Sequence, residues 1–143
     1  MTDINFPTIS SNSVVRPTLV EVDLTRLVEN FRAIQDKVAP AKMMPILKAN
    51  AYGHGLVQVA QVMEALGADY LGVAVLEEGI LLREQGIRTP ILVLGGILGN
   101  QVPYFIEHDL TITASSVEKL WHVDEIAEQL GKTAKVHLKI DTG

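Results

Sequence analysis

Segments typical of buried strands and of amphipathic helices alternate along this chain of 143 residues. The strand, turn and helix recur at intervals of roughly 20 to 26 residues, as in successive βαβ units. Such units join parallel strands through right-handed crossovers. The pattern therefore predicts an α/β fold with a parallel sheet. The expected strands are 18–24, 43–49, 70–75, 91–94, 110–113 and 136–140.

Helical periodicity occupies the intervals between these strands. Apolar residues recur at helical spacing from Leu27 to Val38, where Thr25 is the expected N-cap and Pro40 ends the pattern. Ser116 is expected to cap a later helix, which Gly131 closes. The other expected helices are 59–66, 77–85 and 101–108.

The periodicity leaves two architectures open, an open doubly wound sheet and part of a (β/α)8 barrel. A dinucleotide-binding sheet needs the fingerprint G-x-G-x-x-G after its first strand. The run from Gly53 to Gly55 lacks the third glycine, and glycines 95, 96 and 99 do not fit the spacing. A dinucleotide-binding site is therefore not expected.

Composition excludes several classes of function. The formal net charge is -5 and no run of lysine or arginine stands out, so no nucleic-acid partner is expected. The chain has no cysteine, and its four histidines lack ligand spacing, so no metal site is expected. The polar leader, residues 1–16, lacks the features of a signal peptide, and no stretch is long enough for a membrane span. These observations predict a cytoplasmic protein without a membrane partner.

One lysine stands where covalent chemistry would be expected. Lys48 ends an apolar run, just before a turn rich in glycine. A buried or half-buried amine loses its charge more easily, and its neutral form can condense with an aldehyde. Tyr52 follows four residues later, so a tight turn or a first helical turn would bring its phenol back over the same rim.

The segment from Lys48 to Gly55 closely resembles the pyridoxal-phosphate lysine motif of alanine racemases, a lysine followed by Ala-Asn-Ala-Tyr-Gly-His-Gly. All seven residues after the lysine match. The resemblance covers nearly the whole chain from about Arg16 onward. It includes the segments 18–24, 71–79, 82–87, 90–95 and 137–143.

The resemblance favours the barrel. It implies the N-terminal part of a (β/α)8 TIM-type barrel in residues 17–143, with about five parallel βα units. A complete barrel takes roughly 200 residues or more, so we expect an incomplete barrel without the β-rich second domain of the family. The family forms homodimers in which a tyrosine of the partner's second domain is the base on the opposite face of the substrate. We therefore expect this isolated fragment to be inactive.

The resemblance also assigns roles to individual residues. It implies that Lys48 holds pyridoxal 5'-phosphate as a Schiff base and acts as the catalytic base on one face, and that Tyr52 binds the cofactor phosphate. Ile46 and Leu94 match apolar positions beside the cofactor. Lys139 matches a lysine that is often carbamylated and orients a substrate-binding arginine.

Alternative roles remain open for several of these residues. Ile46 and Leu94 are equally well explained as barrel core, and Lys139 as an ordinary charged residue on a strand. His54, between two glycines, is expected to shape the lysine loop rather than to react.

The expected activity is the interconversion of L-alanine and D-alanine, which supplies D-alanine for cell-wall peptidoglycan. Two alternatives stay open: a racemase of another small amino acid, and a non-catalytic barrel protein that binds pyridoxal phosphate. A third hypothesis is an inert association module that assembles through open sheet edges.

Overall fold

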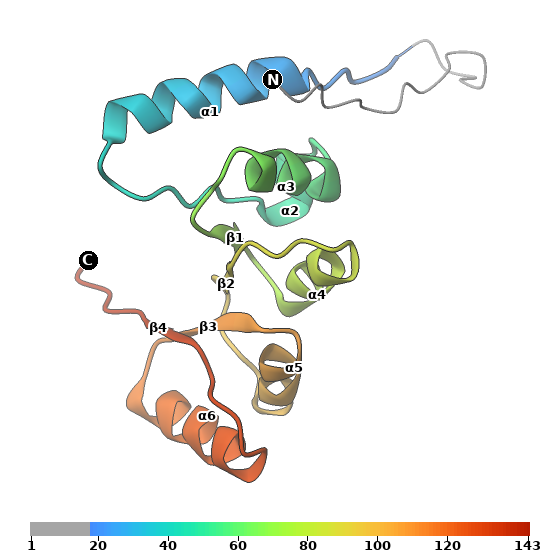
Figure 1. Cartoon of the computed structure of the whole chain (residues 1–143). Coiled ribbons are helices and arrows are strands. Elements are labelled where there is room, and N and C mark those ends of the chain that lie inside the picture. Colours follow the sequence, from blue (N-terminus) through green and yellow to red (C-terminus); the bar gives the residue numbers. More distant parts are fainter. Residues whose placement is uncertain (1–17) are drawn as a thin grey trace.

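The computed structural model describes residues 18–143 and consists of a parallel sheet with helices along it (Figure 1). The strands are β1 (Leu71–Val73), β2 (Ile91–Val93), β3 (Leu110–Ala114) and β4 (Val136–Leu138). The helices are α1 (Leu24–Val38), α2 (Lys48–Tyr52), α3 (Leu56–Ala65), α4 (Leu76–Glu84), α5 (Val102–Glu107) and α6 (Val117–Gln129), with a 3-10 turn, η2 (Gly99–Gln101), before α5.

The four strands stand in the sheet in chain order, and every neighbouring pair is parallel. A helical crossover therefore separates each strand from the next, as βαβ units require. An isolated bridge between Ile46 and Gly72 places the extended residues 43–47 beside β1. The predicted parallel α/β fold is confirmed.

Alternate residues of the strands face opposite sides of the sheet. Leu110 of β3 lies against Gly79 of α4, so this side faces the helices. The Tyr70 hydroxyl contacts Thr111 Oγ1 at 2.9 Å on the other side, where the Tyr70 and His137 rings lie 5.5 Å apart. In Figure 1, α4 and α5 lie on one side of the strands, and the C-terminal residues leave on the other.

The apolar core lies mainly between the sheet and its helices. Its fully buried side chains come from the strands, from α3 to α5 and from the loops between them. The largest are Phe105, Leu71, Leu82, Ile87, Ile91, Leu110 and Ile112. Among residues 18–143, no helix has the length and apolarity that crossing a membrane requires.

The N-terminal part differs from the sequence prediction. Residues 18–23 form no strand, and Leu24 is the first residue of α1. Asp23, rather than Thr25, is the N-cap, because its Oδ1 accepts hydrogen bonds from the backbone N–H groups of Thr25 (2.9 Å) and Arg26 (3.1 Å). The alternating apolar and acidic residues that predicted a strand thus precede α1, and the last acidic residue among them caps this helix. The polar leader 1–16 and the domain boundary proposed after it lie outside the described residues.

The second expected strand is also shorter than predicted. Of residues 43–49, only Ile46 forms a bridge, while Lys48 and Ala49 already belong to α2. The Ser116 cap, in contrast, is confirmed, since its Oγ accepts a hydrogen bond from Lys119 N at 3.3 Å.

Candidate active site

The turn that carries Lys48 lies at the carboxyl end of the extended segment beside β1. Leu47 N donates to Gly72 O at 2.7 Å, and Gly72 N donates to Pro45 O at 2.9 Å. These bonds fix the segment on the sheet up to the residue before Lys48. In barrels of parallel strands, active sites lie at the carboxyl ends of the strands. Lys48 therefore has the position expected of a site residue.

The backbone after Lys48 is strained. Ala49, Asn50, Ala51 and Tyr52 have φ angles of 52°, 57°, 51° and 54°, all in the left-handed region. For residues other than glycine this conformation costs about 1–2 kcal/mol each. Gly53 follows at a φ of 88°, which glycine adopts readily. Strain of this kind persists only where the surroundings hold it, and it clusters at functional sites.

Hydrogen bonds within the loop hold part of this conformation. Asn50 Oδ1 accepts from Leu56 N at 2.8 Å, which links the turn to the start of α3. His54 Nδ1 donates to Ala51 O at 2.8 Å, since a carbonyl oxygen can only accept. This contact agrees with the predicted structural role of His54.

Glu78 ties the same turn to β1 from outside. Its Oε1 accepts from Ala49 N at 2.8 Å and from Asn50 N at 3.4 Å, while its Oε2 accepts from Ala74 N at 2.8 Å. Sequence reasoning missed this residue. The only local signal is the acidic first turn of α4, where a glutamate can reach back to N–H groups before its helix, as in a capping box.

The side chains of Lys48 and Tyr52 are both exposed, and Tyr52 has 60% of its surface accessible. The buried or half-buried setting considered for the Lys48 amine is therefore not found in this structure. Within residues 18–143, no ion pair or hydrogen bond engages Lys48 Nζ. The Lys48 amine is thus accessible on a fixed backbone, because the strain and the hydrogen bonds lie in the main chain.

Ile46 and Leu94 meet over Gly72 of β1. A β-carbon added at Gly72 would lie 2.5 Å from Ile46 Cδ1 and 3.6 Å from Leu94 Cδ1. Both side chains are half-buried. Beside the turn lies a cavity of about 310 Å³, with Ile46, Tyr52 and His54 in its wall. Ile46 therefore lies beside both Leu94 and the cavity that Tyr52 lines.

Lys139 lies apart from this group. It follows β4, three strands along the sheet from β1, a separation of about 14 Å at ordinary strand spacing. Its backbone N donates to Ala114 O at 2.8 Å, and its exposed Nζ pairs with Asp141 Oδ2 at 3.7 Å. Lys139 is thus on the carboxyl edge of the sheet but not against Lys48.

Comparison with known proteins identifies the family. A sequence model described as "Alanine racemase, N-terminal domain" matches residues 22–143. Alanine racemase 2 of Caldanaerobacter subterraneus subsp. tengcongensis is 46% identical over 130 residues, which cover 90% of this chain and 34% of that protein. The chain spans about a third of the length of the curated relatives it matches.

Solved structures give the same result. Alanine racemase of Clostridium difficile in complex with cycloserine matches with a TM-score of 0.86 and 39% identity, over 92% of this chain and 35% of that one. The histidine racemase of Leuconostoc mesenteroides subsp. sake matches with a TM-score of 0.78 and 34% identity, over 83% of this chain and 32% of that one. The sheet is therefore part of a TIM-type barrel, as predicted, and this chain belongs to the alanine racemase N-terminal domain family.

Proposed function

We propose that the protein is a pyridoxal-phosphate-dependent alanine racemase, and that this chain contributes the lysine that holds the cofactor. The observation that carries the proposal is the Lys48 turn. An accessible lysine amine follows an extended segment at the carboxyl edge of a parallel sheet, and the backbone beside it is held in a strained conformation. The identity of 46% to an alanine racemase supports alanine as the substrate.

The residues around the turn fit such a cofactor. Lys48 offers a primary amine without a competing ion pair among the described residues, Tyr52 offers an exposed phenol four positions later, and Ile46 offers an apolar surface nearby. The amine can condense with the aldehyde of the cofactor, the phenol can donate a hydrogen bond to its phosphate, and the apolar surface can pack against its aromatic ring.

When bound, pyridoxal phosphate delocalises the negative charge left on the α-carbon of an amino acid that has lost its proton. We propose that Lys48 Nζ, once the amine of the substrate has displaced it from the cofactor, would take this proton on one face of the substrate. Tyr52 Oη would donate a hydrogen bond to the phosphate, while Ile46 and Leu94 would exclude water from one side of the ring. Racemisation then requires a second acid–base group on the opposite face.

For Lys139 we propose the substrate-orienting role, with carbamylation of its Nζ. Carbamylation by carbon dioxide would form an N–C bond at Nζ and release two protons from the ammonium group, so that a carbamate anion able to hold an arginine would replace the cation. The present partner of Lys139 is an exposed carboxylate at 3.7 Å, and exposed pairs of this kind are weak. The amine is therefore available for such a modification.

The assembly and the cellular role follow from the same proposal. We infer a cytoplasmic homodimer that supplies D-alanine for peptidoglycan. A racemase of another amino acid is the second candidate, because a histidine racemase is among the similar structures. A non-catalytic protein that binds the cofactor is the third.

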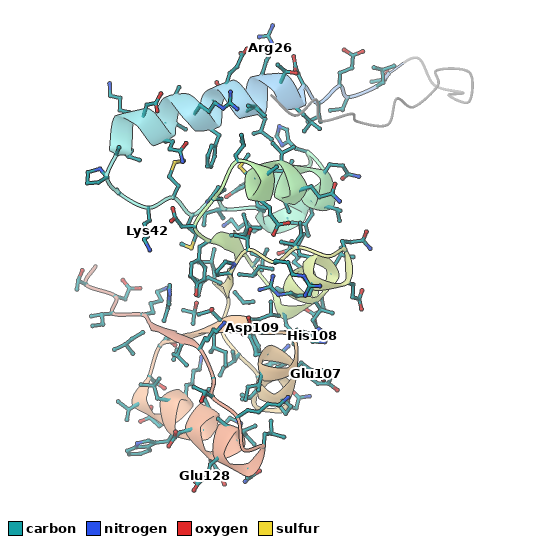
Figure 2. All side chains as sticks on the ribbon, viewed as in Figure 1. Arg26, Lys42, Glu107, His108, Asp109 and Glu128 are labelled. Carbon is teal, nitrogen blue, oxygen red and sulfur yellow. The ribbon has the colours of Figure 1, made fainter. Side chains whose placement is uncertain are left out.

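Absorption spectra of the purified chain with pyridoxal phosphate test the role of Lys48. The bound cofactor should give a visible band, and borohydride followed by peptide mapping should place it on Lys48. Lys48→Ala should lose this label and remain folded, since the side chain is exposed. Lys42→Ala is the matched control, because Lys42 is also exposed and lies on the connection between α1 and α2 (Figure 2). A label that survives in Lys48→Ala would contradict the assignment.

Substrate identity needs a separate measurement. In D2O, removal of the α-proton replaces it by deuterium, which NMR detects for alanine, serine and histidine in parallel. Exchange that is fastest for alanine and depends on Lys48 would support an alanine racemase. Exchange that is fastest for histidine or serine would favour the second candidate. Exchange needs a base on one face of the substrate only, so it can be detected even though racemisation by the isolated chain is not expected. Binding on Lys48 without any exchange would favour the non-catalytic alternative.

A further inference from the structure

The carboxylate of Glu78 joins the turn that carries Lys48 to the end of β1. Its Oε1 accepts hydrogen bonds from the N–H groups of Ala49 and Asn50, and its Oε2 accepts one from Ala74 N. We propose that Glu78 is a positioning residue for Lys48. This inference rests on the function proposed above, in which Lys48 binds the cofactor and takes the proton.

The N–H groups at the start of the Lys48 turn need hydrogen-bond acceptors from another part of the chain. The first N–H groups of any helix have no acceptor within the helix. In α2 these include the N–H groups of Ala49 and Asn50, and among the described residues Glu78 is their acceptor. A carboxylate is a suitable acceptor here, because hydrogen bonds to an ionised group are roughly twice as strong as neutral ones.

The contact fixes Lys48 from its C-terminal side. The peptide before Lys48 is held by Leu47 O, which accepts from Ala51 N at 2.8 Å. The peptide after it is held by the Ala49 N–H on Glu78. The α-carbon of Lys48 thus lies between two anchored peptides, while its side chain remains exposed. A group held in this way reacts faster, because less freedom is lost on the way to the reacting geometry.

Capping of α4 alone does not explain this arrangement. A glutamate at this place in the first helical turn can reach back to an N–H just before its own helix, and the bond from Ala74 N has this character. The bonds from Ala49 and Asn50 come from a segment 28 and 29 residues away. They join α4 to the Lys48 turn, which a cap confined to α4 does not require.

Amide hydrogen exchange of the whole chain tests the contact directly. In Glu78→Gln one oxygen becomes an NH2 group, which cannot accept, so one side of the bridge is lost. We expect the Ala49 or the Ala74 amide to exchange at least about tenfold faster, given the strength of hydrogen bonds to charged groups. Glu77→Gln is the matched control, since it removes the same charge from the same helical turn at an exposed position. In this control the Ala49 and Ala74 amides should exchange at the same rates as in the unsubstituted chain.

The rate of labelling by pyridoxal phosphate and borohydride tests the consequence. In Glu78→Gln the rate at Lys48 should fall about tenfold or more, while the rate at Lys42 stays the same. A purely structural role would lower the melting temperature of Glu78→Gln but leave the ratio of the Lys48 and Lys42 rates unchanged. An unchanged ratio would therefore overturn the proposal.

The two measurements separate this inference from the proposed function. If Lys48 takes no label in the unsubstituted chain, the proposed function fails, and amide exchange alone decides whether Glu78 holds the turn. If Lys48 is labelled and Glu78→Gln changes neither exchange nor labelling, only the inference fails. Should Glu78→Gln not fold, Glu78→Asp keeps the charge and withdraws the carboxylate by one methylene, and the same faster exchange is expected.

Discussion

Gly95 packs against the backbone of Ala74 where β1 and β2 end. Gly95 N donates to Ala74 O at 3.0 Å, and a β-carbon at position 95 would overlap the same oxygen. A backbone oxygen cannot rotate away as the end of a side chain can. The loop that follows Leu94 therefore depends on glycine at this position.

The first prediction concerns this close approach. Gly95→Ala should lower the free energy of unfolding by about 1–3 kcal/mol, the usual cost of forcing an extra carbon into a filled space. Urea unfolding measures the change. Gly96→Ala is the control, because its added carbon meets only the flexible end of Lys119, with Nζ 3.3 Å away. Equal effects of the two substitutions would contradict the prediction.

A second prediction concerns Asn50, which occupies the left-handed region and binds Leu56 N through its side chain. Asn50→Ala should lower the free energy of unfolding by about 1–2 kcal/mol, because Leu56 N loses its acceptor and alanine tolerates this φ less well. Asn50→Asp retains the acceptor and should stay close to the unsubstituted chain. Thermal unfolding of both variants checks this, and equal melting temperatures for Ala and Asp would count against it.

The sequence predicts the regular elements well where local chemistry decides them. The cap at Ser116 follows from one side chain and its own helix, and it is confirmed. The cap at Thr25 is wrong because Asp23, two residues earlier, can also cap, and its extended backbone starts the helix at Leu24. Periodicity cannot distinguish these two starts.

The site is harder to predict because long-range contacts build it. A motif of eight residues identifies Lys48, but it does not reveal that the side chain is exposed while the adjacent backbone is strained. The partner that holds this backbone, Glu78, is 29 residues from Ala49. Its role appears only once β1 lies beside the lysine segment.

A third prediction concerns Arg83, a half-buried side chain at the end of α4. Its guanidinium donates to four backbone carbonyls, those of His108, Ile87, Thr89 and Asp109, at 2.9 to 3.1 Å. Arg83→Lys keeps the charge but cannot reach four acceptors in this fork geometry. We expect the free energy of unfolding to fall by about 2 kcal/mol or more, since the carbonyls lose charged donors.

Urea unfolding of Arg83→Lys and Arg88→Lys makes the comparison. Arg88 is exposed, so the same substitution there should change the free energy of unfolding by less than about 0.5 kcal/mol. A loss of similar size at both positions would show that the four carbonyl contacts of Arg83 are not responsible.

The last prediction concerns acid stability and Glu64. Burial acts to raise the pKa of Glu64, but hydrogen bonds from the N–H groups of Thr89 and Arg88 and from the Thr89 hydroxyl, with the charge of Arg83, outweigh it and lower the pKa below 4.5. A carboxyl group with a lowered folded-state pKa contributes stability above its ordinary pKa and loses it as pH falls through the lowered value.

Glu64→Gln should therefore unfold more easily than the unsubstituted chain near neutral pH, and this difference should shrink as pH falls below 4.5. Urea unfolding from pH 7 down to the limit of folding measures it. Glu84→Gln, at an exposed position, is the control for the lost charge. If the difference for Glu64→Gln stays constant across this range, the carboxylate is not the source of the acid sensitivity, because a lowered pKa requires the two curves to converge.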